Sequence, residues 1–328
     1  MNHKSPTMRD VANRAGVSIT TISHVINKTR SVNQETREAV LRAMKELRYL
    51  PPAKRARAKA LRVGVILADA REDYYIEMTK SLESAAAEYN ISVIFCDSEA
   101  DFEKEQNNLE NLLNMGVNGL IFAPADSDRI PKALLKTTVP VVLYDRQYES
   151  HTFLSIGINN FQSGYAGAKK LLENGCKRPG FIGYSDPVDT IRKRTQGFKS
   201  ALLELAPAVR PQVLNLNYNG GDSFPLIKNF ISEGKLDGLI CATSTICYEL
   251  IVALDTMDEG VKKNIRIISF DDNRWFDYVR YPISVIIQPV AEIAGAALEN
   301  LLALIEKPNS RQVARELHFE TTIKEGTR

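Results

Sequence analysis

Hydrophobic positions in the first fifty residues recur at helical spacing and predict three short helices. The first begins at Thr7, and Asp10 three residues later completes a capping-box arrangement. Gly16 ends this helix, a second begins directly after Ser18, and a third covers 34–49 and stops before two prolines. Three short helices with a tight turn between the first two are typical of a helix-turn-helix unit, although a three-helix adaptor that binds no DNA has the same pattern.

From residue 63 onward, apolar runs of four to eight residues alternate with amphipathic helices. A first set contains VGVILA, ISVIFC, GLIFAP and VPVVLY, and a second contains FLSIGI, PGFIGY, QVLNLNY, GLICAT and RIISFD. Such strands, separated by helices, form parallel sheets that are covered on both faces. Two sets predict two α/β lobes with a cleft between them, and ligands of such folds bind at the carboxyl ends of the strands.

Charge divides the chain at the same place. Residues 1–62 carry 14 Lys and Arg against 4 Asp and Glu, whereas the other residues carry 28 against 36. The net charge of +2 therefore conceals a basic N-terminal segment ahead of an acidic body. This asymmetry is typical of a nucleic-acid-binding module, although a solvated basic tail would give the same count.

Several functional classes are disfavoured by what the sequence lacks. The cysteines have apolar neighbours and no CxxC spacing, so buried free thiols and no metal site are expected at Cys96, Cys176, Cys241 and Cys247. There is no apolar stretch of signal-peptide or membrane-spanning length, which favours a cytoplasmic, nucleoid-associated protein without a membrane partner.

Enzyme motifs are missing as well. The turn after the first strand, LADAREDYY, is not GxGxxG, and no GxxxxGK(S/T) occurs. Gly-Tyr-Ser at 183–185 lacks the closing glycine of a nucleophile elbow. We therefore expect no enzyme activity and no cofactor.

The motifs DVA, AGVS, T-x-S, V-N, V-x-x-x-T-R and L-x-Y occur in step within residues 7–50. On these motifs the segment resembles the headpiece of the lactose/galactose repressor (LacI/GalR) family. The resemblance implies a sequence-specific transcription regulator, a repressor in the first instance, that binds a palindromic double-stranded DNA operator as a homodimer. It also implies a helix-turn-helix headpiece over 1–50, a basic hinge over 51–62, and an effector-binding and dimerisation domain over 63–328.

The resemblance assigns DNA contacts to the second helix. Ile19 and Thr20 correspond to the family's main specificity pair, and His24 stands where the family most often has an arginine that binds guanine. Because histidine offers one donor and titrates near neutral pH, the base preference there is expected to differ, and a phosphate contact or a solvent-facing side chain is the alternative. Phosphate contacts are expected from hydroxyl and amide side chains, namely Thr7, Ser18, Thr21, Ser23 and Asn27.

The hinge, PPAKRARAKALR, carries five basic side chains on an alanine background that favours helix. A flexible cationic linker accounts for this composition. In the family, however, the hinge folds on the operator into a minor-groove helix with a leucine wedged into a base step, and Ala58 has that position here. Leu61 shares a helical face with Ala58 and is the candidate for a shifted wedge. We predict a weakly kinked operator, with Arg55 and Arg57 in the minor groove.

The α/β domain resembles the type I periplasmic sugar-binding fold that this family uses as its sensor. In that fold the chain passes between the lobes three times, so lobe one is expected over about 63–157 plus 289–328 and lobe two over about 158–285. The expected fold class is an all-α three-helix headpiece joined to a two-lobed α/β periplasmic-binding-protein-like domain with parallel sheets.

Candidate effector contacts lie near strand ends. Tyr74 and Tyr75 stand in the place of the family's aromatic pair, and their rings could stack on a sugar or a base. Arg194 stands three residues before Gly-Phe, as the family's ligand-binding arginine does, and Asp271 belongs to a Phe-Asp-Asp motif. A guanidinium and a carboxylate together hold vicinal hydroxyls. From the residues alone, a helix-surface cation and a helix N-cap are the alternatives for Arg194 and Asp271.

Further candidates complete the predicted site. Thr243-Ser244 replaces the Asn-Asp usual in the family and changes the hydrogen-bonding groups of the pocket. Trp275 is either a stacking platform in the cleft or a packed core residue. The weaker candidates are Asp69, Asp145, Arg146 and Gln288. A carbohydrate is the leading effector, ahead of nucleobases and other polar metabolites. The alternative function is a cytosolic solute sensor with degenerate DNA recognition and a protein partner.

Overall fold

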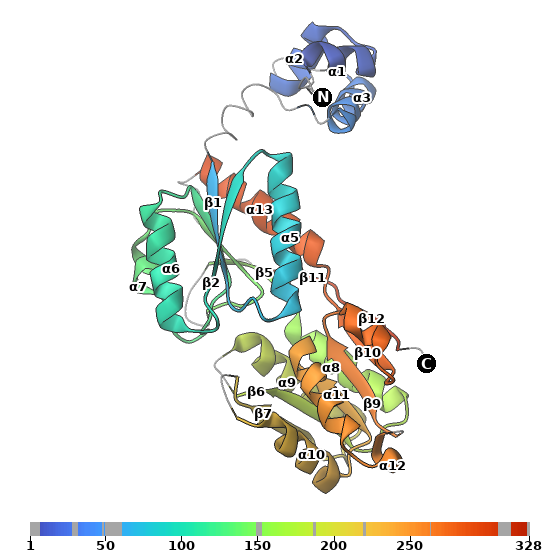
Figure 1. Ribbon diagram of the computed structural model, residues 1–328. Coiled ribbons are helices and arrows are strands. Elements are labelled where there is room, and N and C mark those ends of the chain that lie inside the picture. The colour runs from blue at the N-terminus through green and yellow to red at the C-terminus, as the bar shows by residue number, and fades with distance from the viewer. Residues whose placement is uncertain are drawn as a thin grey trace. The chain divides into compact units, whose positions relative to one another are not determined.

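The computed structural model describes residues 7–27, 32–47, 49, 61–148, 153–185, 188–218, 221–262, 264–307 and 316–326 (Figure 1). The chain divides into two compact units, Met1–Arg62 with Ser84–Val93 and Val63–Glu83 with Ile94–Arg328. Most of the hinge lies outside the described residues, and with it the predicted DNA contacts Arg55, Arg57 and Ala58.

The N-terminal unit contains the three predicted helices, α1 (Met8–Ala15), α2 (Ile19–Asn27) and α3 (Gln34–Glu46). The capping box is present, because the Thr7 backbone N–H donates to the Asp10 carboxylate at 2.7 Å and the Asp10 N–H donates to the Thr7 hydroxyl at 3.4 Å. Gly16 ends α1 with a φ of 66°, a left-handed conformation that suits glycine.

The apolar faces of these helices meet in one small core. Its buried members are Val11, Ala12, Ile22, Val40, Ala43 and Tyr49. The predicted third helix is too long at its end, because the Tyr49 N–H donates to the carbonyl of Met44, five residues back, at 2.9 Å. That bond closes the helix and turns the tyrosine ring into the core.

The first sheet of the α/β unit has the strand order β11-β5-β4-β3-β1-β2. Its strands β1, β3, β4, β5 and β11 are parallel to their neighbours, and β3 and β4 are buried throughout, which explains their uninterrupted apolar runs. Figure 1 shows α6 and α13 on opposite faces. The strands are β1 (Arg62–Leu67), β2 (Ser92–Asp97), β3 (Gly119–Phe122), β4 (Val141–Tyr144), β5 (Leu154–Ile158) and β11 (Glu316–Phe319). With this sheet, four helices form the first lobe: α5 (Asp73–Glu88), α6 (Phe102–Asn114), α7 (Lys132–Lys136) and α13 (Val290–Glu306).

The second sheet has the strand order β12-β10-β9-β8-β6-β7 and is parallel except for β12, which is antiparallel to β10. Helix α8 packs against α9, and α10 packs against α11. The strands are β6 (Pro179–Tyr184), β7 (Gln212–Leu216), β8 (Gly238–Cys241), β9 (Arg266–Phe270), β10 (Ile283–Ile287) and β12 (Thr322–Lys324). The helices of this second lobe are α8 (Asn160–Glu173), α9 (Asp189–Leu205), α10 (Ser223–Gly234), α11 (Ser244–Asp255), α12 (Glu259–Lys262) and the 3-10 helix η1 (Arg274–Tyr278).

Two strand assignments made from the sequence need correction. The alternation places FLSIGI at the start of the second set, whereas β5 pairs with β4 in the first sheet. The resemblance assigns 289–328 to lobe one, whereas β12 pairs with β10 in the second sheet. The residues at 320 and 321 alone separate β11 from β12, so the chain changes sheet within two residues. A three-residue edge strand has no apolar period of its own, and the free edge of β10 decides where it pairs.

The thiols are free, and Cys176, Cys241 and Cys247 are buried as predicted, whereas Cys96 is only half-buried. No described helix is both long and apolar enough to cross a membrane. Across the described ranges, no group of three or more His, Cys, Asp or Glu side chains is arranged to hold a metal ion.

Candidate functional site

A cavity lies between the two lobes at the carboxyl ends of their strands. Its volume is about 30 Å³, enough for roughly two water molecules and too small for a sugar. The residues that line it are Glu72, Tyr74, Tyr75, Asp145, Arg146, Tyr184, Val188, Thr190, Ile191, Arg194, Tyr218, Thr243, Asp271 and Gln288.

Two aspartates occupy matching positions in the two lobes. Asp145 directly follows β4 with a φ of 59°, and Asp271 directly follows β9 with a φ of 66°. The Asp145 N–H donates to the Ile156 carbonyl at 3.0 Å, and the Asp271 N–H donates to the Ile286 carbonyl at 3.1 Å. In each lobe, therefore, a left-handed residue closes a strand against its neighbour and presents a carboxylate to the cavity.

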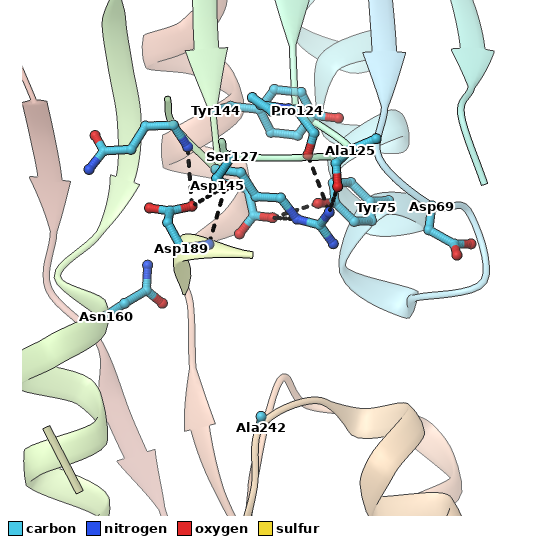
Figure 2. Close-up of polar contacts among 12 residues, drawn as sticks. Asp69, Tyr75, Pro124, Ala125, Ser127, Tyr144, Asp145, Asn160, Asp189 and Ala242 are labelled. Atoms are coloured by element: carbon cyan, nitrogen blue, oxygen red, sulfur yellow. Dashed lines mark hydrogen bonds and ion pairs between the residues drawn. The ribbon is translucent and has the colours of Figure 1, made fainter. Parts of the chain in front are cut away.

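Each of these carboxylates has one oxygen bound to a protein donor. The Tyr75 hydroxyl donates to Asp145 Oδ2 at 2.5 Å (Figure 2), and Gln288 Nε2 donates to Asp271 Oδ1 at 2.7 Å. Burial raises the pKa of Asp145, and it raises the pKa of Asp271 to about 6 although Arg194 and Gln288 act in the opposite direction. The second oxygen of each aspartate is left for a ligand that donates hydrogen bonds.

Arg194 is buried in the second lobe at 3% exposure. Its Nε donates to Asn160 Oδ1 at 2.8 Å and its Nη1 to the Ala242 carbonyl at 2.6 Å, and the guanidinium lies 3.9 Å from the centre of the Phe270 ring. A helix-surface cation is therefore ruled out, and the remaining donors of the fixed guanidinium are available to the cavity.

Arg146 is the corresponding cation of the first lobe. Its Nη1 donates to the carbonyls of Pro124 and Ala125 at 3.2 and 3.3 Å, and its Nε lies 3.6 Å from Asp145 Oδ2. Figure 2 shows both carbonyls next to the Tyr75 and Asp145 pair. Backbone carbonyls thus fix the arginine of each lobe at the cavity wall, Ala242 in the second lobe and Pro124 and Ala125 in the first.

Hydrogen bonds between the lobes close the cavity on two sides. On one side the Tyr218 hydroxyl donates to Asp69 Oδ2 at 2.6 Å and the Thr245 hydroxyl donates to Glu72 Oε2 at 3.0 Å. On the other, the Ser127 hydroxyl donates to Asp189 Oδ1 at 3.1 Å (Figure 2). These contacts connect the turn after β1 and the turn after β3 to the second lobe, so the structure is that of a closed cleft.

One hydroxyl of the cavity wall lacks a partner. Tyr74 is buried at 5% exposure, its ring meets that of Tyr75 edge to face at 5.3 Å, and its oxygen has no hydrogen-bond partner among the described residues. A buried hydroxyl without a partner is costly, and a ligand atom in the cavity would satisfy it.

The cavity brings together most of the predicted effector residues, and the ones that line it are Tyr74, Tyr75, Asp145, Arg146, Arg194, Thr243, Asp271 and Gln288. Asp69 stays outside the lining, because Arg71 and Tyr218 bind its carboxylate. Trp275 is also outside and packs edge to face on Tyr248 and Phe276 at 5.8 and 4.4 Å. The N-cap of the 3-10 helix η1 is Asn273, not Asp271.

The sequence analysis missed several lining residues. The polar ones are Glu72, Tyr184, Thr190 and Tyr218, and the apolar ones are Val188 and Ile191. Tyr184 ends a buried apolar strand, and this position at the carboxyl end was a usable signal. Tyr218 ends the predicted run QVLNLNY and carried the same signal, although β7 itself stops two residues earlier, at Leu216.

In the headpiece, the predicted DNA-contacting side chains start at the N-terminus of α2. Ile19 is 43% exposed, and His24 is half-buried. The Ser18 hydroxyl accepts the Thr21 N–H at 3.1 Å, and the Thr7 hydroxyl belongs to the capping box of α1. Thr20, Ser23 and Asn27 belong to α2, and their side chains lie outside the described part; Leu61 is half-buried just before β1.

Comparison with known proteins places the chain in a family. Residues 7–52 match bacterial regulatory proteins of the lacI family, and residues 63–309 match the periplasmic binding protein domain. The transcriptional repressor PurR of Haemophilus influenzae (strain PittEE) is 32% identical over 309 residues, 91% of each chain. The chain belongs to the lacI family. It is a DNA-binding transcription regulator with a helix-turn-helix headpiece and a two-lobed periplasmic-binding-protein-like domain, as predicted.

Solved structures share this lacI-family fold. A complex of the transcriptional regulator CelR with cellobiose has a TM-score of 0.70 at 20% identity and covers 98% of this chain and 99% of its own. The lac repressor dimer bound to operator and the anti-inducer ONPF has a TM-score of 0.68 at 22% identity and covers 99% of each chain. At these identities the likeness concerns the fold.

Proposed function

We propose that this regulator binds a palindromic operator as a homodimer and that a small polyhydroxylated effector, a sugar in the first instance, binds between its lobes and changes its affinity for DNA. In this proposal α2 enters the major groove, where Ile19, Thr20 and His24 contact base edges. The hydroxyls near the helix ends contact phosphates and set the position of the headpiece on the duplex.

The observation that carries the effector proposal is the facing pair of aspartates. In Asp145 and in Asp271, one carboxylate oxygen accepts a hydrogen bond from a described residue of the protein and the other does not. The guanidinium of Arg194, which Asn160 fixes in place, lines the same cavity. Acceptors that face one another with a fixed donor suit vicinal hydroxyls, which donate and accept at adjacent atoms. The rings of Tyr74 and Tyr75 add apolar surface for the C–H face of a sugar.

Coupling to DNA follows from the closed cleft. A cavity of about 30 Å³ has to enlarge before it admits a sugar, which breaks or rearranges hydrogen bonds such as Tyr218 to Asp69 and Thr245 to Glu72. A ligand that binds one arrangement of the lobes more tightly shifts the population towards it, and DNA that prefers one arrangement is then coupled to the ligand.

Selection of the full-length protein against a random double-stranded DNA library, with and without a mixture of neutral sugars, tests the regulator. An enriched palindrome supports a dimer on two half-sites. Enrichment that changes when sugars are added supports the coupling. A pool without any enriched sequence in either condition contradicts operator binding, and equal enrichment in both contradicts a sugar effector.

A further inference from the structure

Glu72 is a buried acid in the cavity wall that the sugar proposal does not use. Its side chain lines the cavity at 7% exposure, and one carboxylate oxygen accepts the Thr245 hydroxyl. No basic side chain of the described residues lies within 4.0 Å of it: the adjacent Arg71 pairs with Asp69 at 2.6 Å. Arg146 lies beside Asp145 and two backbone carbonyls. Glu72 is therefore a buried carboxyl without an ion-pair partner.

The count of charged residues in the cavity wall also leaves one acid without a matching cation. Three lining residues are acids, Glu72, Asp145 and Asp271, and two are cations, Arg146 and Arg194. Arg146 is the main cation acting on Asp145 and Arg194 is the main cation acting on Asp271, so the acid in excess of the two cations is Glu72. Burying a carboxylate is unfavourable unless it is protonated or matched by a cation.

Aromatic rings surround this carboxyl on the second-lobe side. Tyr184 and Tyr218 meet edge to face at 4.7 Å, and the charge of Glu72 acts on both hydroxyls, raising their pKa in addition to the effect of burial. Ring faces attract cations, as Arg71 over the Tyr218 ring at 5.1 Å already illustrates. A carboxyl beside two tyrosine rings is a suitable environment for a small cation.

We propose that the effector carries a cationic nitrogen on its hydroxylated skeleton, as an amino sugar does, and that Glu72 binds this nitrogen. The inference rests on the proposed function of the cavity and specifies the ligand class of the same site. The hydroxyls meet Asp145, Asp271 and Arg194, and the ammonium donates to the Glu72 oxygen that Thr245 leaves unused.

Release of a proton on ligand binding is a second quantity by which the proposal can be tested. Burial raises the pKa of Glu72 to about 7, with Thr245 and Arg146 opposing this and the carboxylates of Asp271 and Asp69 adding to it. The groups that face Glu72 are these residues together with the hydroxyls of Tyr184 and Tyr218. An ammonium beside Glu72 favours the charged carboxylate, so at pH values where the amine is still protonated binding releases a proton and tightens as pH rises from about 5 to 7.

Calorimetric titration of the full chain with matched pairs of sugars tests the inference. Glucosamine against glucose, galactosamine against galactose, and mannosamine against mannose each exchange one hydroxyl for an ammonium. The expected result is an amine that binds at least about tenfold tighter than its hydroxyl partner. The same titrations in two buffers of different ionisation enthalpy should show that binding of the amine releases protons, whereas binding of the neutral sugar does not.

Matched variants assign the effect to Glu72. Glu72→Gln keeps an acceptor for Thr245 and should lower the ratio of amine affinity to neutral-sugar affinity about tenfold or more and abolish proton release. Glu83→Gln removes an exposed charge from α5, the helix that begins directly after Glu72, and should change neither. Neutral sugars that bind as tightly as the amines would overturn the inference and leave the proposed function intact. If no member of any pair binds, the inference and the sugar-class effector are both rejected, while the DNA selection still decides whether the chain is a regulator.

Discussion

Gly164 of α8 lies directly against the backbone carbonyl of Arg194 in α9. A Cβ at position 164 would come within 2.1 Å of that oxygen, and a Cβ at Gly197 would come within 2.0 Å of the Phe161 carbonyl. The two helices therefore touch backbone to backbone at both places. This close packing, together with the Asn160 hydrogen bond, fixes the helix from which Arg194 reaches the cavity.

Gly164→Ala should accordingly separate the two helices and displace Arg194. We expect a loss of roughly 1–3 kcal/mol in the free energy of unfolding and a weakened affinity for any cavity ligand. Urea unfolding followed by tryptophan fluorescence measures the first, and titration measures the second. Gly295→Ala is the control, since a Cβ there meets nothing within 4 Å in the middle of α13. It should stabilise by about 0.5–1 kcal/mol. Equal behaviour of the two variants would contradict the packing argument.

Tyr218→Phe should loosen the closed cleft. The substitution keeps the ring and removes a 2.6 Å hydrogen bond to the buried Asp69 carboxylate, a bond of a kind that contributes roughly 1.5–3 kcal/mol. Small-angle X-ray scattering of the ligand-free protein should then give a larger radius of gyration.

Tyr281→Phe is the matched control for that experiment. It removes an equivalent bond, from the Tyr281 hydroxyl to Asp255 at 2.8 Å, within the second lobe. Its scattering should match that of the unchanged protein. If Tyr218→Phe also leaves the scattering unchanged, the hydrogen bond to Asp69 has no part in holding the lobes together.

Glu105→Gln should stabilise the protein at alkaline pH. Burial raises the pKa of Glu105 to about 8, so the folded chain binds a proton that the unfolded chain has released, and stability falls as pH rises from about 4.5 to 8. The glutamine removes this decline and should be more stable by roughly 2 kcal/mol at pH 8, with little difference near pH 5. Urea midpoints at pH 5, 6, 7 and 8 measure it. Glu110→Gln, exposed on the same helix, should leave the pH profile unchanged.

Thr7→Ala should weaken the first headpiece helix. The substitution removes the side-chain half of the capping box, which typically contributes about 1 kcal/mol. Hydrogen exchange of the amides in α1 should speed up about fivefold. Thr7→Ser retains the hydroxyl and should exchange at the original rate. Faster exchange in both variants would assign the stabilisation to the threonine methyl group and not to the cap.

The sequence predicted the residues whose positions are set locally. Asp271 follows a buried strand, and the carboxyl ends of parallel strands converge on one edge, so its strand position agreed with the Phe-Asp-Asp motif on which the prediction rested. Tyr74 and Tyr75 were predicted from their correspondence with the family's aromatic pair, and they lie in the first turn of α5. The capping box at Thr7 is a purely local pattern.

The contacts between the lobes were not predictable in this way. Tyr218 enters the cavity because its hydroxyl meets Asp69 on the other lobe, a contact 149 positions apart in the chain. The same contact removes Asp69 from the lining. The prediction of Trp275 as a stacking platform in the cleft is wrong for a related reason, because its ring packs against Tyr248 of α11. Tertiary packing decides which of several possible partners a side chain contacts. Such a choice produces no periodic pattern of apolar residues in the sequence.

Three segments join the lobes: one after β5, one after β10, and the two residues between β11 and β12. β11 pairs with β5 in the first sheet, and β12 pairs with β10 in the second, so all three leave from neighbouring strands at one edge of each sheet. A single tether would let two bodies twist and slide, whereas three tethers along one edge leave bending about that edge as the easy motion. Whatever the ligand, the sensor of this regulator can then report it through little more than one coordinate, the opening angle about that edge.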